Sequence, residues 1–313
     1  MKGITNIIKW RKNWLPAGTA AGTVPLTIGY YGEGHPQVTI VAGVHGDEGP
    51  WGAWAIHKFL ERVQPEQITG SLKIVPQANP LAMGSDSRVA PLDHLDLNRV
   101  FPGDKNGSYT ERLAYSITKN ALENADIVID LHGGGSWCVN AFAFRFIGSE
   151  ELAAAFNPPF ILDAPKREGT LTRYAKDQGS KVTAVEMGGR CDEEKAWAEY
   201  IATGIERCLS HVGVIEKKEL DFGRKTVPVG PSRVLRPSKG GLLIPEVDAS
   251  AVGTIVEKGT YLGRIVDPAS MATLEAFEAP YSETALLLLR PRMTVLEGGA
   301  MTYVISSPLI QGD

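Results

Sequence analysis

The stretch "VTIVAGVHGDEGPWGAWAIHKFLERV", Val38 to Val63, contains a complete strand–turn–helix unit. Its first part, Val38 to Val44, is a continuous apolar run of strand length, which is typical of a strand buried on both faces. The second part has Pro50 in its first turn and apolar residues three or four positions apart, which predicts a helix. The turn between them presents His45 and Glu48 among glycines. The unit therefore predicts a buried strand that ends in polar, metal-competent side chains.

The same alternation continues through the first two thirds of the chain. Further strands are predicted at "SLKIVPQANP" (71–80), "ADIVIDLHGGG" (125–135) and "KVTAVEMGG" (181–189). Further helices are predicted at "TERLAYSITKNALEN" (110–124), with Thr110 as its cap, at "LTRYAKDQG" (171–179) and at "EEKAWAEYIATGIERCLSHVG" (193–213). Apolar strands that alternate with helices indicate an α/β fold whose mostly parallel or mixed, doubly wound sheet is covered on both faces.

The pattern changes after about Gly213. From Val227 onward, short strand-like segments are separated by glycine and proline, and no helix is predicted. The chain has 313 residues, which exceeds the size at which a single core usually stops growing. We therefore expect two domains, an α/β domain over residues 1–220 and a smaller all-β domain over residues 221–313.

Composition narrows the choice of partners and compartment. The net charge is -4 and no basic block stands out, so neither nucleic acid nor an anionic membrane is an expected partner. Three cysteines without C-x-x-C spacing indicate a reducing compartment and no disulfide framework. The N-terminus carries charges and tryptophans where a signal peptide needs an apolar core, and the longest apolar runs are too short to span a bilayer. We expect a soluble, cytoplasmic protein, and the pattern is compatible with a homo-oligomer.

Three of the predicted strands end in the same way, with a metal-competent or acid–base residue at a glycine-rich turn. These residues are His45 and Glu48 in "GVHGDEG", His132 in "DLHGGG" and Glu186 in "VEMGG". Sites in open α/β sheets form outside the carboxyl ends of the strands, so we expect these side chains to share one crevice. Two histidines and one glutamate are the ligand set of a catalytic zinc site that keeps one position open. Asp130, two residues before His132, is a candidate to orient that histidine.

These motifs, together with "DLNRVFPG", occur in the order that resembles the succinylglutamate desuccinylase/aspartoacylase family, a branch of the zinc carboxypeptidase superfamily. The resemblance implies a zinc carboxypeptidase-like sheet and one zinc ion per chain, held by His45, Glu48 and His132. It implies that Glu186 is the catalytic carboxylate.

The resemblance also assigns roles in a fourth segment, "SRVAPLDHLDLNRVFPG". Arg99, with Asn98, would hold the carboxylate of the substrate, and Arg88 would polarise the scissile carbonyl. The C-terminal domain of the family resembles a biotinyl/lipoyl-type β-sandwich. Carrier domains of that type modify a lysine, but "MATLEAFEAP" (271–280) has none at the corresponding place, which argues against a swinging-arm role.

The function implied is zinc-dependent hydrolysis of the amide bond in an N-acyl amino acid or a similar small carboxylate substrate. An alternative is a zinc carboxypeptidase that acts on a peptide or a peptidoglycan fragment with the same residues. A third reading is a non-catalytic zinc- or ligand-binding module, against which Glu186 argues, because a site that only binds needs no general base. The acyl group is not evident from the sequence.

Overall fold

A computed structural model describes residues 3–15, 22–190, 193–216 and 225–309. The centre of the fold is a block of four parallel strands in the spatial order β4 (Ser71–Val75), β3 (Gln37–Ala42), β5 (Ile127–His132) and β8 (Lys181–Gly188). Antiparallel strands flank these four strands on both sides. The sheet is therefore mixed, which is one of the two arrangements that the sequence predicted. They are β2 (Pro25–Gly32), which pairs with β1 (Lys9–Trp14), and β6 (Val139–Arg145) on the opposite side.

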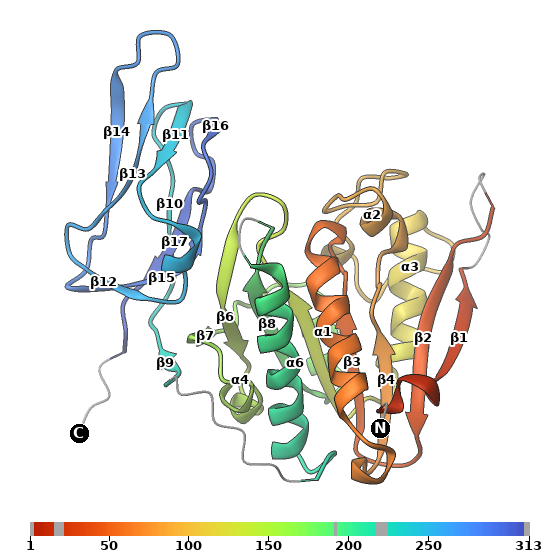
Figure 1. The fold of residues 1–313 in the computed structure, drawn as a ribbon. Helices are drawn as coiled ribbons and strands as arrows, with labels where there is room; N and C mark the ends of the chain where they lie inside the picture. The colour runs from red at the N-terminus through yellow and green to blue at the C-terminus, as the bar shows by residue number, and fades with distance from the viewer. Residues whose placement is uncertain (1–2, 16–21, 191–192, 217–224, 310–313) are drawn as a thin grey trace.

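Helices cover both faces of the sheet, as expected for a doubly wound fold. Helices α1 (Gly49–Arg62) and α6 (Glu194–His211) lie side by side on one face (Figure 1), and α4 (Glu150–Phe156) packs beside them. The other face carries α3 (Tyr109–Ile117) and α5 (Leu171–Asp177). Ile40 belongs to the first hydrophobic cluster and its neighbour Val41 to the second, because successive residues of a strand point to opposite faces.

Short helical turns complete the first part of the chain. They are α2 (Pro80–Gly84), η1 (Ile4–Asn6), η2 (Gly46–Glu48), η3 (Pro65–Gln67), η4 (Leu97–Arg99) and the π-helical η5 (Thr118–Leu122). Thr110 does not cap α3, so that prediction is wrong. The N-cap is Ser108, whose N–H donates to the Glu111 carboxylate, whereas the hydroxyl of Thr110 donates to Asp93. No helix of the described residues is long and apolar enough to cross a membrane.

The described C-terminal residues form strands and one short helical turn, η6 (Ala249–Ala251). A four-stranded antiparallel sheet contains β14 (Thr273–Glu278), β13 (Tyr261–Val266), β11 (Gly241–Pro245) and β16 (Thr294–Leu296), in that order. The other strands here are β9 (Val227–Pro228), β10 (Arg233–Leu235), β12 (Ile255–Glu257), β15 (Glu283–Leu289) and β17 (Tyr303–Ser306). The predicted boundary at 220/221 lies outside the described residues.

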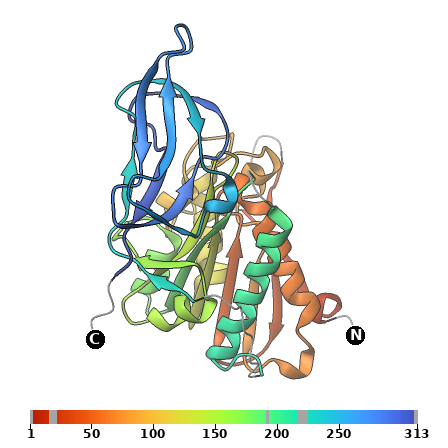
Figure 2. The same ribbon diagram turned by 60° about the vertical axis from the view of Figure 1, so that its left-hand side comes forward.

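The C-terminal strands are joined to the central sheet. Strand β15 pairs with β6 in an antiparallel ladder that places Leu288 opposite Asn140, and β17 and β10 follow β15. At the same side of the sheet, β7 (Phe160–Asp163) pairs with β6, and β9 pairs with β7. Figures 1 and 2 show the resulting arrangement, in which the C-terminal strands stand beside β6 at one end of the sheet. This pairing brings C-terminal side chains within reach of the carboxyl ends of β5 and β8.

Candidate active site

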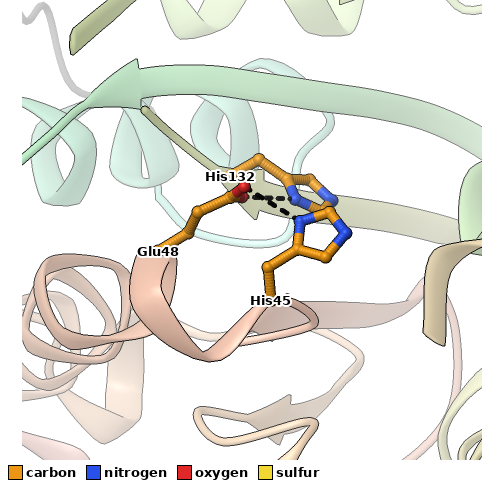
Figure 3. A group of neighbouring side chains, drawn as sticks. All are labelled: His45, Glu48 and His132. Carbon is orange, nitrogen blue, oxygen red and sulfur yellow. Dashed lines mark hydrogen bonds and ion pairs between the residues drawn. The ribbon is translucent and has the colours of Figure 1, made fainter. Parts of the chain in front are cut away.

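The side chains of His45, Glu48 and His132 meet at the carboxyl edge of the sheet. His45 and Glu48 come from the turn after β3, and His132 is the last residue of the adjacent strand β5. All three are buried, and one nitrogen or oxygen from each lies within 4.8 Å of the others. Figure 3 shows the two imidazole rings and the carboxylate turned toward one another. The predicted convergence of the two turns is therefore present in the structure.

The donor atoms of this group fit a divalent metal ion. Nδ1 of each histidine lies 3.0 Å from a different oxygen of Glu48, and Nδ1 of His45 is buried without a hydrogen bond of its own. The Nε2 atoms of the two histidines contact other carboxylates. Nε2 of His45 lies 3.1 Å from Oδ1 of Asp96, and Nε2 of His132 lies 2.9 Å from Oδ2 of Asp130. Carboxylates in these places favour the tautomers that leave Nδ1 unprotonated, which is how histidine ligands are commonly oriented. Burial alone would raise the pKa of Glu48, but the two histidines hold it well below its usual range.

The turn that carries two of these donors depends on close backbone packing. A Cβ atom on Gly46 would lie 2.0 Å from the carbonyl carbon of Ala82 in α2, so only glycine fits here. We predict that Gly46→Ala lowers the free energy of unfolding by about 1–3 kcal/mol, as overpacking typically does, and displaces the turn from the candidate metal site. Denaturant unfolding measures this loss. Gly84→Ala is the matched control, because a Cβ there meets nothing within 4 Å; equal losses in both variants would contradict the prediction.

Glu186 lies beside the same group. It sits on β8 directly opposite His132 in the parallel ladder, and Nδ2 of Asn140 donates to its Oε2 at 3.0 Å. Burial raises the pKa of Glu186 to about 7, with Glu48 adding to the effect and the histidines and Asn140 opposing it. A carboxyl group that titrates close to neutral pH is suited to accept and return a proton.

Arg88 and Asp96 contact two members of this group, Glu48 and His45. The guanidinium of Arg88 donates to Glu48 Oε1 at 3.2 Å and to Asp96 Oδ2 at 3.0 Å. Asp96 also accepts the hydrogen bond from the N–H of Asn98 at 2.9 Å and contacts His45. The sequence offered Asp96 only as part of "DLNR"; its contact with a histidine of the site was missed.

Asn98 and Arg99 follow Asp96 in η4. Oδ1 of Asn98 accepts the N–H of Leu171 at 2.8 Å, which fixes the orientation of its amide, and Arg99 donates to the Asn98 carbonyl at 2.6 Å. Burial lowers the pKa of Arg99, and the nearby Arg167 and Arg88 add to this while Asp96 opposes it. Arg167 belongs to the loop before α5, whose Gly169 carbonyl accepts the N–H of Phe101 at 3.0 Å.

Two cavities are lined by the residues of the candidate site. One of about 370 Å³ is lined by His132 and Glu186, and the other, of about 280 Å³, by His45, Glu48, Arg88 and Glu186. Their linings share five residues, which are Asn98, Arg99, Phe144, Arg167 and Glu186. All seven residues predicted for the site therefore line one or both cavities. Asn140, which contacts Glu186, was missed because nothing in "VNAFAFR" marks it as a site residue.

Comparison with known proteins gives a consistent family. Residues 34–212 match the model of the succinylglutamate desuccinylase/aspartoacylase catalytic domain. The chain is 32% identical over 267 residues to N-alpha-acetyl-L-2,4-diaminobutyric acid deacetylase of Halomonas elongata, an alignment that covers 78% of this chain and 74% of that protein.

Solved structures show the same fold. A succinylglutamate desuccinylase from a Silicibacter species superimposes with a TM-score of 0.83 at 23% identity, covering 96% of this chain and 95% of that chain. The product-bound ectoine utilization protein EutE of Ruegeria pomeroyi gives 0.82 at 24% identity, again with 96% and 95% covered. The likeness extends across both parts of the chain, including the C-terminal strands.

Proposed function

This chain belongs to the succinylglutamate desuccinylase/aspartoacylase family and is a deacylase that hydrolyses amides, and from that premise we propose that it uses one zinc ion per chain to cleave an N-acyl amino acid. The observation that carries the proposal is the meeting of His45, Glu48 and His132 beside Glu186, in cavities that Arg99 also lines. The deacetylase of Halomonas elongata supports the substrate class, since its name describes an amino acid acylated on nitrogen.

The chemistry follows from the positions of the side chains. A zinc ion held by His45, Glu48 and His132 would supply two things when bound, a lower pKa for a water molecule, about 7, and polarisation of the amide carbonyl. Glu186 accepts the proton of the attacking water and returns it to the amine nitrogen as the C–N bond breaks. The products are a carboxylic acid, which gains the oxygen of water, and the free amino acid. Asn140 holds the carboxylate of Glu186 in place for both transfers.

Two arginines complete the proposed mechanism. Arg88, next to Glu48, stabilises the negative charge that develops on the amide oxygen. Arg99 binds the carboxylate of the amino acid through its planar guanidinium, and the amide of Asn98 lies beside it. His132 and His45 are kept in their orientation by Asp130 and Asp96.

We predict that Arg99→Lys lowers kcat/KM about 10- to 100-fold, mostly through a higher KM. Lysine keeps the charge but cannot form two parallel hydrogen bonds with a carboxylate, and hydrogen bonds to charged groups contribute about 1.5–3 kcal/mol. Steady-state kinetics with an N-acetyl amino acid measures the effect. Arg233→Lys, an exposed position on β10, is the control. A KM within twofold of the wild-type value in Arg99→Lys would remove Arg99 from substrate binding.

We also infer that residues 221–313 form a domain of biotinyl/lipoyl-type sandwich that shapes the entrance of the site. Leu243 of the four-stranded sheet and Leu286 of the large sheet belong to one hydrophobic cluster, which supports a core shared by the two sheets. Six residues of these C-terminal strands and loops line the smaller cavity together with the proposed metal-site residues; they include Val234 and Met301. Such a wall narrows access to the site, which favours small substrates over peptides.

A hydrolysis panel tests the proposed function. The zinc-loaded protein is incubated with N-acetyl, N-succinyl and N-formyl amino acids and, in parallel, with short peptides, and the release of free amine is measured. We expect turnover of N-acyl amino acids with little release from peptides. Faster cleavage of the peptides would favour a carboxypeptidase, and no release from any compound in the presence of zinc would overturn the proposal.

A further inference from the structure

The two cavities share Glu186 in their linings but differ in the other residues that line them. The larger one, here called the cationic chamber, has twice as many cations as carboxylates in its lining: Arg99, Arg145, Lys166, Arg167, Arg173 and Lys176 against Asp130, Asp163 and Glu186. The smaller one has an apolar wall, made by Trp137, Phe142, Leu162, Val234, Leu288 and Met301. The smaller cavity balances three arginines with three carboxylates, so a substrate that spans the reacting centre meets an excess of positive charge with one half and a charge-balanced pocket with an apolar wall with the other.

The apolar wall is assembled from distant parts of the chain. Phe142 and Leu162 come from the paired strands β6 and β7, and Val234 and Leu288 come from the C-terminal strands β10 and β15. The pairing of β15 with β6 brings these two groups together. Phe142, Leu162 and Leu288 belong to a single buried hydrophobic cluster, so this side of the smaller cavity is already packed.

Trp137 and Met301 are held by a common partner. The guanidinium of Arg290 lies 3.8 Å from the centre of the Trp137 ring, and its Nε donates to the carbonyl of Met301 at 2.8 Å. An arginine over an indole ring is a favourable arrangement that positions the Trp137 ring, and the hydrogen bond positions the backbone of Met301. The wall is thus a preformed surface, and a hydrocarbon group that enters finds it in place.

The charges decide which half of the substrate faces the wall. Every N-acyl amino acid carries a carboxylate on its amine side, and this half belongs with Arg99 and the cationic chamber. The acyl half then extends along the apolar wall. Two cations of the smaller cavity, Arg99 and Arg167, are shared with the larger one, and the third, Arg88, is paired with Glu48 and Asp96. A negatively charged acyl group such as succinyl would therefore find no further unpaired cation in the smaller cavity.

Resting on the proposed function, we propose that the preferred acyl group is an uncharged hydrocarbon chain longer than acetyl, bound along the apolar wall. A series of N-acetyl, N-propanoyl and N-butanoyl derivatives of one amino acid tests this with the zinc-loaded protein. Each buried methylene contributes about 0.8 kcal/mol, which corresponds to about a fourfold gain, so kcat/KM should rise about 15-fold from acetyl to butanoyl. Values that stay level or fall along the series would overturn the inference.

A binding measurement gives a second readout that does not depend on turnover. In Glu186→Gln, calorimetric titration should show tighter binding of the N-butanoyl than of the N-acetyl compound by a similar factor. Equal dissociation constants for the two compounds would contradict the assignment of the acyl half to the wall.

A pair of methionine variants locates the effect. Met301→Gln places a polar amide of similar length in the wall and should reduce the butanoyl-to-acetyl ratio to below about fourfold, the loss of roughly one methylene's gain. Met293→Gln makes the same chemical change at an exposed residue outside both cavities and should keep the wild-type ratio. An unchanged ratio in Met301→Gln would overturn the assignment of the wall. Hydrolysis of the acetyl compound without a chain-length effect refutes only this inference, whereas absence of hydrolysis throughout the series refutes the proposed function as well.

Discussion

Glu186→Gln is expected to lower kcat about 10²- to 10⁴-fold, the usual contribution of a general acid–base group. Glutamine has nearly the same shape and can still contact Asn140, but it cannot take a proton from the attacking water. The proposed metal donors His45, Glu48 and His132 are untouched, so the zinc content of the purified variant should equal that of the wild type. Steady-state kinetics together with metal analysis by atomic absorption measures both quantities.

The control for this variant is Glu123→Gln, which removes a carboxylate from an exposed ion pair with Lys119. It should retain wild-type kinetics. If Glu186→Gln kept a kcat within a few-fold of the wild type, Glu186 would not be the proton carrier. A low kcat accompanied by loss of zinc would instead make Glu186 part of the metal site.

His132→Ala is expected to abolish tight zinc binding and, with it, detectable hydrolysis. His132 is one of the three proposed protein donors, and alanine also removes the imidazole that contacts the buried carboxylates of Glu48 and Asp130. Zinc content after dialysis against a weak chelator measures the loss of affinity. His57→Ala, at a half-buried position of α1 outside both cavities, is the matched histidine control.

A second, milder variant keeps this test informative if His132→Ala does not fold. Asp130→Asn retains the shape of the side chain that faces Nε2 of His132 but removes its charge, and loss of such an outer partner typically costs 10- to 100-fold in metal affinity. If a folded His132→Ala variant bound zinc with wild-type affinity, the metal would be bound at another site. The same conclusion would follow if both His132→Ala and Asp130→Asn kept wild-type affinity.

The sequence pattern was enough to place four candidate side chains at neighbouring strand ends. His45, Glu48, His132 and Glu186 each follow a strongly apolar strand, and parallel strands place their carboxyl ends at one edge, so a local pattern was enough to bring them together. Asp96 was harder to identify, because an aspartate before a helical turn is also a common cap, and it does cap η4. Its contact with His45 depends on the three-dimensional path of a long loop.

Two features of the fold were not predicted, each for its own physical reason. Strand β1, "KWRKNW", is mostly exposed and lacks the apolar run by which a buried strand is identified. The continuation of the central sheet from β6 into β15 joins residues about 150 positions apart, and such pairing leaves no local signature in either segment. The apolar wall of the smaller cavity depends on that same pairing, so it could be found only from the structure.

Zinc titration of metal-free protein tests the central claim most directly. The protein is stripped with a chelator, zinc is added in steps, and the release of amine from an N-acyl amino acid is followed at each step. The account predicts no activity without metal and a linear rise that ends at about one zinc ion per chain. Full activity of the stripped protein, or no gain in activity on adding zinc, would contradict it.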